Sequence, residues 1–138
     1  MTKNNNMLKQ LPGFLKLAVV FFLLTSCVDD ARLEDNLALW VGSWTCNEIE
    51  GDFAPQTYQI EIVEKVDYNE VAIKGLYNQG QLFSVDAEIS GGSIFIPSQT
   101  VQQINIEGTG SLDNSEITLF FTANDGSGPD QVEAILYR

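Results

Sequence analysis

The chain has 138 residues, with 19 acidic side chains against 7 basic ones and a net charge of −12 at neutral pH. A chain this acidic repels phosphate backbones, which comes close to excluding nucleic-acid binding. The absence of histidine excludes Ser-His-Asp and Cys-His catalytic arrangements and removes the commonest metal ligand. We therefore predict that the protein is not an enzyme and has neither a metal site nor a cofactor.

Residues 1–26 have the pattern of a secretory signal peptide. Three lysines accompany an apolar run at 17–24, which is too short for a membrane-spanning helix of roughly 20 residues. A short buried helix of a globular domain is the alternative. The run closes on Leu24-Thr25-Ser26-Cys27, which resembles the bacterial lipobox. That resemblance implies acylation of Cys27, which then becomes the N-terminus of the mature protein.

The lipobox resemblance also implies where the protein resides. In bacterial lipoproteins the cysteine carries two or three acyl chains, so Cys27 would attach the protein to a membrane without a spanning helix. Residues 27–39 form a lipidated N-terminus and acidic tether, with a helical turn expected within 31–39. Acidic residues so close to the cysteine resemble export signals of some Gram-negative lipoproteins. We predict a surface-exposed outer-membrane location, with a periplasm-facing anchor as the alternative.

From Trp40 onward the chain consists of short β-like runs broken by turn residues. These runs predict eight strands, at Gly42–Ile49, Tyr58–Glu64, Val71–Tyr77, Gln81–Ile89, Ser93–Ile96, Val101–Gly110, Glu116–Ala123 and Gln131–Arg138. The connections are too short for parallel crossovers, so neighbouring strands should pair antiparallel. We predict one all-β domain at 40–138, forming an up-and-down barrel, with a β-sandwich as the alternative.

The step Gly42-Ser43-Trp44 resembles the opening of the lipocalin, or calycin, families. In those families the tryptophan plugs the closed end of the barrel, and a basic residue near the end of the last strand packs across it. The resemblance implies that Arg138 packs on Trp44 by a cation–π contact. Residues 94–99, Gly108-Thr109-Gly110 and the last hairpin also resemble small lipocalin-like domains of secreted bacterial lipoproteins. Trp44 equally fits a plain core position of any β domain.

Aromatic side chains near loops are the first candidates for a binding surface. Tyr58 and Tyr77, together with Tyr68 and Phe53, could supply such a surface. Trp44 and Arg138 join these tyrosines as candidate binding residues through the lipocalin resemblance.

Asp86 is the one acidic candidate for binding. It lies two residues from Glu88, so both carboxylates share a strand face, which is usually a solvated face and only rarely a catalytic pair. If Asp86 pointed into the barrel, it would need hydrogen-bond partners such as Tyr58 or Ser84.

Two further features receive structural interpretations. With Cys27 committed to lipid, Cys46 has no disulfide partner, and we predict a small buried hydrophobe in the first strand. The run Asp125–Asp130 places oxygens at alternate positions, as calcium loops do, but it lacks the full twelve-residue pattern. We predict a hairpin loop with Asx turns there.

The function expected from these features is that of a membrane-anchored, non-enzymatic envelope lipoprotein. Its barrel would be a small binding module for an apolar molecule, a sugar or a protein partner. The alternative is a structural or adhesion accessory that acts by protein contact and has no internal ligand.

Overall fold

The computed structural model of the protein describes residues 36–138. The predicted signal peptide, Cys27 and most of the predicted tether lie outside the described residues. A helical turn at 36–40 precedes the strands, and no helix in this part of the chain is long and apolar enough to cross a membrane. The elements are β1 (Gly42–Glu50), β2 (Gln56–Glu64), β3 (Glu70–Gly75), the 3₁₀ turn η2 (Leu76–Asn78), β4 (Gly80–Ser90), β5 (Ser93–Val101), β6 (Ile104–Asp113), β7 (Glu116–Asn124) and β8 (Pro129–Tyr137).

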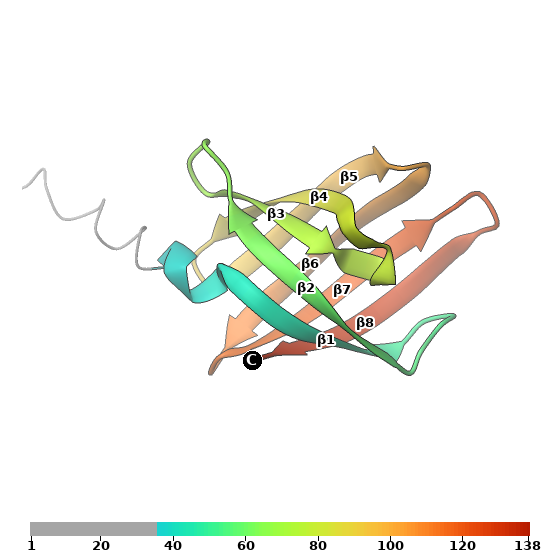
Figure 1. Ribbon diagram of the computed structural model, residues 1–138, viewed down its shortest axis with the longest axis horizontal. Helices are drawn as coiled ribbons and strands as arrows, with labels where there is room; N and C mark the ends of the chain where they lie inside the picture. Colours follow the sequence, from blue (N-terminus) through green and yellow to red (C-terminus); the bar gives the residue numbers. More distant parts are fainter. Residues whose placement is uncertain (1–35) are drawn as a thin grey trace, which may run out of the picture. The chain divides into compact units, whose positions relative to one another are not determined.

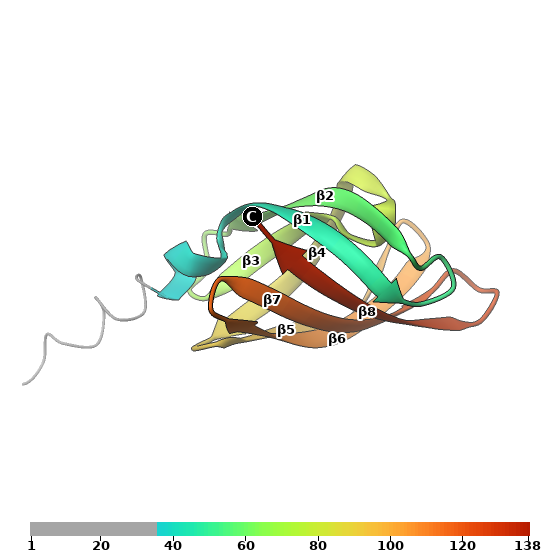
Figure 2. The ribbon, with the colours of Figure 1, turned by 90° about the horizontal axis from the view of Figure 1, so that it is seen from below.

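The eight strands close into an up-and-down barrel (Figures 1 and 2). Each strand pairs antiparallel with the next one along the chain, and β8 returns to pair antiparallel with β1. This confirms the predicted all-β class, the number of strands and the barrel topology, and it excludes the sandwich alternative. Closure gives every strand a hydrogen-bonded neighbour on both sides, although β4 and β5 pair only between Glu88–Ser90 and Ser93–Phe95.

The barrel interior follows from the two-residue period of its strands. In β1, for example, Trp44, Cys46 and Glu48 are buried while the residues between them face outward. An eight-stranded barrel is just wide enough for such side chains to fill. The largest fully buried side chains are Trp40, Trp44, Phe83, Ile60, Ile62, Ile73, Leu76, Ile96, Ile106, Ile117, Leu119 and Leu136.

The two ends of the barrel differ in what lies across them. We call the end beside the helical turn 36–40 the plug end; it also holds Trp44 and the β2–β3 turn at 65–69. We call the opposite end the mouth end; it holds η2 and the loops at 51–55 and 125–128. Figure 1 shows the helical turn at one end of the strands and these loops at the other.

The predicted strand boundaries agree with the structure to within two residues, except that the strand predicted at Ser93–Ile96 is longer and the strand predicted at Val101–Gly110 lies three residues later, as β6. Two of the differences have a clear physical reason. The strand expected to stop at Pro97 continues to Val101, because the β5–β6 register shifts between Ile96 and Gln99 and accommodates the proline. Beyond Phe95, β5 makes no further backbone pairs with β4. There the Gln99 side chain bridges the gap, accepting from the Asp86 N–H at 2.9 Å and donating to the Asp86 carbonyl at 2.8 Å.

The second difference lies after β3. The predicted strand Val71–Tyr77 ends at Gly75, whose φ of 85° requires the left-handed region that glycine adopts most readily. The chain then turns inward as η2, which buries Leu76 and Tyr77. Sequence periodicity gave no sign of this inward turn.

Candidate functional site

The plug end contains the contact that the lipocalin resemblance implied. The guanidinium carbon of Arg138 lies 4.0 Å from the centroid of the Trp44 ring, within the range of a cation–π interaction. The same guanidinium donates hydrogen bonds to the carbonyls of Val41 and Leu39. Trp44 is buried, and its Nε1 donates to the Trp40 carbonyl at 2.7 Å. These contacts make Trp44 and Arg138 part of the closure of this end.

The mouth end contains a buried carboxylate that sequence reasoning missed. Glu48 is fully buried, and both of its oxygens accept a hydrogen bond, one from the Tyr58 hydroxyl and one from Gln56 Nε2 at 2.6 Å. The inward period of β1, which Glu48 shares with Trp44 and Cys46, was a signal that could have located it. Burial raises the pKa of the Tyr58 hydroxyl above its ordinary value of 10.0, and the neighbouring Cys46 and Glu48 raise it further.

A second buried carboxylate, Asp130, holds two mouth-end segments together. Asp130 is 4% exposed and accepts from the Tyr77 hydroxyl at 2.9 Å and from the Asp52 N–H at 2.8 Å. The β1–β2 loop, η2 and β8 therefore meet at one side chain. Burial, followed by the hydrogen bond to Asp130, raises the pKa of the Tyr77 hydroxyl.

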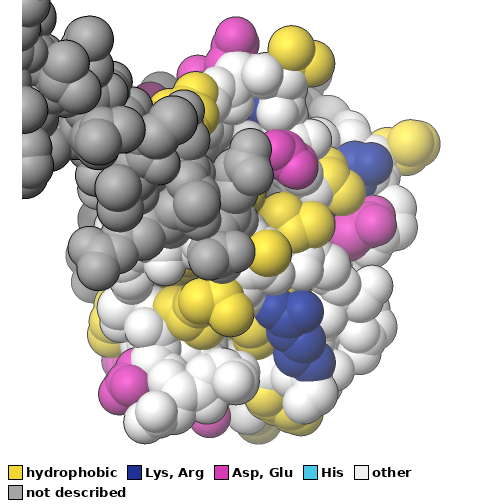
Figure 3. All heavy atoms as spheres, turned by 90° about the vertical axis from the view of Figure 1, so that its left-hand side faces the viewer, with side chains coloured by type: hydrophobic (Ala, Val, Ile, Leu, Met, Phe, Trp, Pro, Cys, Tyr) yellow, Lys and Arg dark blue, Asp and Glu magenta, His cyan; other side chains and the backbone are white. Residues whose placement is uncertain are grey.

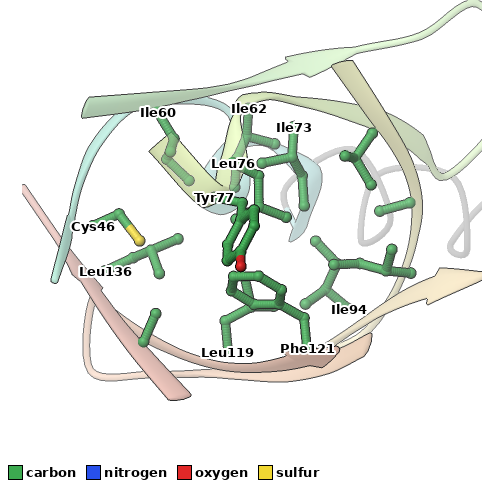
Figure 4. Close-up of a cluster of buried hydrophobic side chains, with 14 of the residues drawn as sticks. Cys46, Ile60, Ile62, Ile73, Leu76, Tyr77, Ile94, Leu119, Phe121 and Leu136 are labelled. Atoms are coloured by element: carbon green, nitrogen blue, oxygen red, sulfur yellow. The ribbon is translucent and has the colours of Figure 1, made fainter. Parts of the chain in front are cut away.

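Tyr77 occupies the centre of the barrel (Figure 4). Its ring packs edge-on against Phe121 with 6.1 Å between centroids, and against Phe53 of the β1–β2 loop at 5.7 Å. Its φ of 58° is unfavourable for a bulky residue, and burial together with the Asp130 bond offsets that cost. Because Tyr77 and Leu76 reach inward from η2, the mouth of the barrel is filled by the chain itself.

This arrangement changes what the tyrosine candidates can do. Tyr58 and Tyr77, which we expected to supply a recognition surface, are each only 9% exposed, because one lies at an inward position of β2 and the other is turned inward after Gly75. Tyr68 and Phe53 are exposed by 63% and 62%. The two buried carboxylates are already bonded to tyrosine, amide and backbone donors, so their evident role is to tie the mouth-end segments together.

Asp86 lies on the outer face of β4, not inside the barrel. Its carboxylate is 3.1 Å from Lys65 Nζ, which is also 3.3 Å from Glu70. The hydrogen bonds to Asp86 and Glu70 raise the pKa of the Lys65 ammonium. Exposed ion pairs of this kind contribute little to stability. The recorded partners of Asp86 are Lys65 and Gln99. None of the other candidate binding residues is among them.

Cys46 and the last hairpin have the structures that were predicted. Cys46 is a free, buried cysteine of β1, and burial raises the pKa of its thiol to about 12, which makes it unreactive at neutral pH. In the hairpin, Asn124 and Asp125 accept from the N–H groups two residues ahead, as Asx turns do. Within residues 36–138 no group of three or more acidic or cysteine side chains is placed to hold a metal.

The outer wall of the barrel has a groove of about 460 Å³ across β5 to β8. Phe95 and Phe120 flank Thr109 in the strand register and are each about half exposed. Gly108 lies in the floor, where an added Cβ would come within 2.4 Å of the Phe120 carbonyl oxygen. Three glutamates also line the groove, namely Glu50, Glu107 and Glu133. We call this groove, lined by Phe95, Gly108, Thr109, Phe120 and the three glutamates, the outer groove.

Sequence reasoning missed the outer groove, although one signal was present. Phe120 and Phe121 are consecutive in a strand, so their side chains must point to opposite faces, and one of them must face water. Knowing that Phe95 lies on the same wall required the pairing of β5 with β6 and of β6 with β7.

Comparison of the chain with protein-family models, with curated proteins and with solved structures gave no match.

Proposed function

We propose that this protein is a non-enzymatic, lipid-anchored lipoprotein of the bacterial outer membrane whose barrel binds a partner in its outer groove. The observation that carries this proposal is a contrast. The barrel interior is occupied by its own side chains, with Tyr77 at the centre, while two phenylalanines on the outer wall remain half exposed. This favours binding at the surface over the internal ligand of a carrier.

The anchor is supported by the N-terminal sequence. The basic start, the apolar run at 17–24 and the small residues before Cys27 occur together in the order that the lipobox requires. Two or more acyl chains on Cys27 would give durable attachment, whereas one chain alone binds a membrane only marginally.

The outer groove indicates the chemistry of the partner. Its exposed apolar surface consists of Phe95 and Phe120, and its charged lining residues are all glutamates. Exposed aromatic surface of this kind marks interaction sites, and the glutamates would repel an acidic partner and attract a basic one. The fitting occupant is a protein segment that presents an aromatic or aliphatic side chain next to lysine or arginine.

Two peptides test the binding site on the lipidated mature protein in detergent. One has a central tryptophan flanked by lysines, and the other has glutamates in place of the lysines. We expect the basic peptide to bind with an affinity that falls as salt rises, and the acidic peptide not to bind. Fluorescence anisotropy of labelled peptides measures both.

Variants locate the binding. Phe120→Ser removes half of the aromatic surface and should weaken binding of the basic peptide about threefold to tenfold, since Phe120 is half exposed and burying a whole phenylalanine contributes about 1.5–3 kcal/mol. Leu82→Ser is the control, because Leu82 is 91% exposed and does not line the outer groove. Equal affinity of the wild type and Phe120→Ser would contradict the proposed site. Incorporation of labelled palmitate that is lost in Cys27→Ser tests the anchor separately.

A further inference from the structure

The plug end exposes apolar side chains that the fold leaves uncovered. Val66, in the turn between β2 and β3, is fully exposed, and its neighbour Tyr68 is 63% exposed. Leu39, in the helical turn, is 55% exposed. Figure 3 looks onto this end, where hydrophobic side chains lie between scattered charges. We call Leu39, Val66 and Tyr68 the plug-end patch.

A hollow separates the two segments that carry the plug-end patch. Its volume is about 670 Å³, and its apolar lining comes from Leu37, Ala38 and Val41 on one side and from Val66 and Tyr68 on the other. The basic side chain in the hollow, Lys65, is paired with Glu70 and Asp86, and the acidic side chains of the lining are Glu64 and Asp67. The turn presents Val66 and Tyr68 outward beside these acids, so the surface it can contact is one without net negative charge.

Such a patch has the composition of a membrane-interface contact. Tyrosine favours the headgroup region, where its ring is in an apolar setting and its hydroxyl is in water, and aliphatic side chains insert just below it. The fold does not bury Val66, so burial in the barrel does not account for its apolar side chain.

The number of residues between Cys27 and the first described residue indicates which surface this patch can reach. This step rests on the proposed acylation of Cys27. About nine residues separate Cys27 from the first described residue, and an extended chain spans at most about 3.3–3.6 Å per residue, or roughly 30 Å. That chain joins the barrel beside Leu39, at the plug end. The plug end is therefore the part of the barrel that a bilayer holding Cys27 contacts most readily.

We propose that the plug-end patch rests in the interface of the bilayer that holds the acylated Cys27. In this orientation the mouth end points away from the membrane, and the outer groove on the barrel wall stays in water. The occupant of the patch is thus a lipid surface and not a second protein.

Spin labels on the lipidated mature protein in phosphatidylcholine vesicles test the orientation. One label is placed at Val66→Cys and a matched one at Ser127→Cys, an exposed position of the mouth end. The wild-type chain, with Cys46 buried, serves as the unlabelled control. We expect the label at 66 to be several-fold more accessible to oxygen, which dissolves in the bilayer, than to a water-soluble nickel complex. The label at 127 should show the reverse.

Flotation of the same vesicles separates the two proposals. If the protein floats with the vesicles but the label at 66 is as accessible to nickel as the label at 127, the orientation is wrong and the anchor stands. If the protein does not float, the anchor fails and the orientation fails with it. The variant Leu39→Ser with Tyr68→Ser should still float, and it should lose most of the oxygen preference at position 66.

Discussion

The two ends of the barrel are closed by different chemistry. At the plug end the closure is apolar and cationic. The Arg138 guanidinium lies over the Trp44 ring and donates hydrogen bonds to two backbone carbonyls. At the mouth end it is polar and acidic, with Glu48 and Asp130 each bonded to a tyrosine. The comparison teaches that one end depends on packing of a large side chain, while the other depends on hydrogen bonds between buried carboxylates and tyrosine hydroxyls.

The largest effect we expect comes from removing the plug itself. Trp44→Ala deletes a fully buried indole and leaves a cavity, which costs about 3–5 kcal/mol for a large aromatic residue. Urea unfolding followed by fluorescence measures the loss. Leu82→Ala, at a position that is 91% exposed, should change stability by less than about 0.5 kcal/mol. A similar small loss for Trp44→Ala would show that the plug end is not closed by packing.

The next effect separates the two ends by pH, since the buried thiol and hydroxyls lie toward the mouth end. The pKa of Cys46 is raised from its ordinary 9.0 to about 12, and the pKa of Tyr58 is raised above 10.0. A raised pKa in the folded state contributes stability that is complete below the unfolded pKa and is lost as pH rises. We therefore expect Cys46 and Tyr58 to make stability fall from about pH 9, by about 2 kcal/mol between pH 10 and pH 11, and Tyr77, whose pKa is also raised, to add to this loss.

Urea midpoints measured from pH 7 to pH 11 check this expectation. Cys46→Val should remove the part of the loss that begins near pH 9.0, because the unfolded chain then has no thiol to ionise. At the plug end Trp44 is not titratable, but the Lys65 ammonium, whose pKa is raised by its hydrogen bonds to Asp86 and Glu70, also loses stabilisation at high pH. Only the part of the loss that Cys46→Val removes is therefore assigned to the mouth end. Flat stability up to pH 11 in the wild type would contradict the burial of Cys46 and Tyr58 in the native state.

The strands and their closure could be predicted from the sequence, whereas the inward turn at η2 could not. Turn residues at short intervals and alternating runs such as 58–64 report local preferences, and those set the strands. The turn at Gly75 is different, because Tyr77 adopts a positive φ that only its distant partners Asp130 and Phe121 stabilise. Contacts between residues more than 40 positions apart leave no periodic signal in the chain.

The candidate site shows the same division. The Trp44–Arg138 contact followed from a family resemblance, because it depends on where two strands begin and end. Glu48 and Asp130 were overlooked, although both occupy inward positions of their strands. An acidic residue there conflicts with burial unless donors are present, and the donors, Tyr58 and Tyr77, come from other strands and turns. The strand period indicates that such a residue is buried, but it does not identify the partner.

The smallest effect we predict tests whether the mouth end depends on those donors. Tyr58→Phe keeps the ring but removes the hydroxyl that bonds Glu48, so the fully buried carboxylate keeps only Gln56. An unmet hydrogen bond at a buried acceptor should lower the free energy of unfolding by about 1–2 kcal/mol. Tyr68→Phe removes the same hydroxyl from an exposed ring and should cost less than about 0.5 kcal/mol. Because the β1–β2 loop connects Glu48 to Gln56, amide exchange at 51–54 should also accelerate in Tyr58→Phe and stay unchanged in Tyr68→Phe. Equal stability of the two variants would mean that Glu48 does not depend on Tyr58, and that packing, and not this hydrogen bond, holds the mouth end.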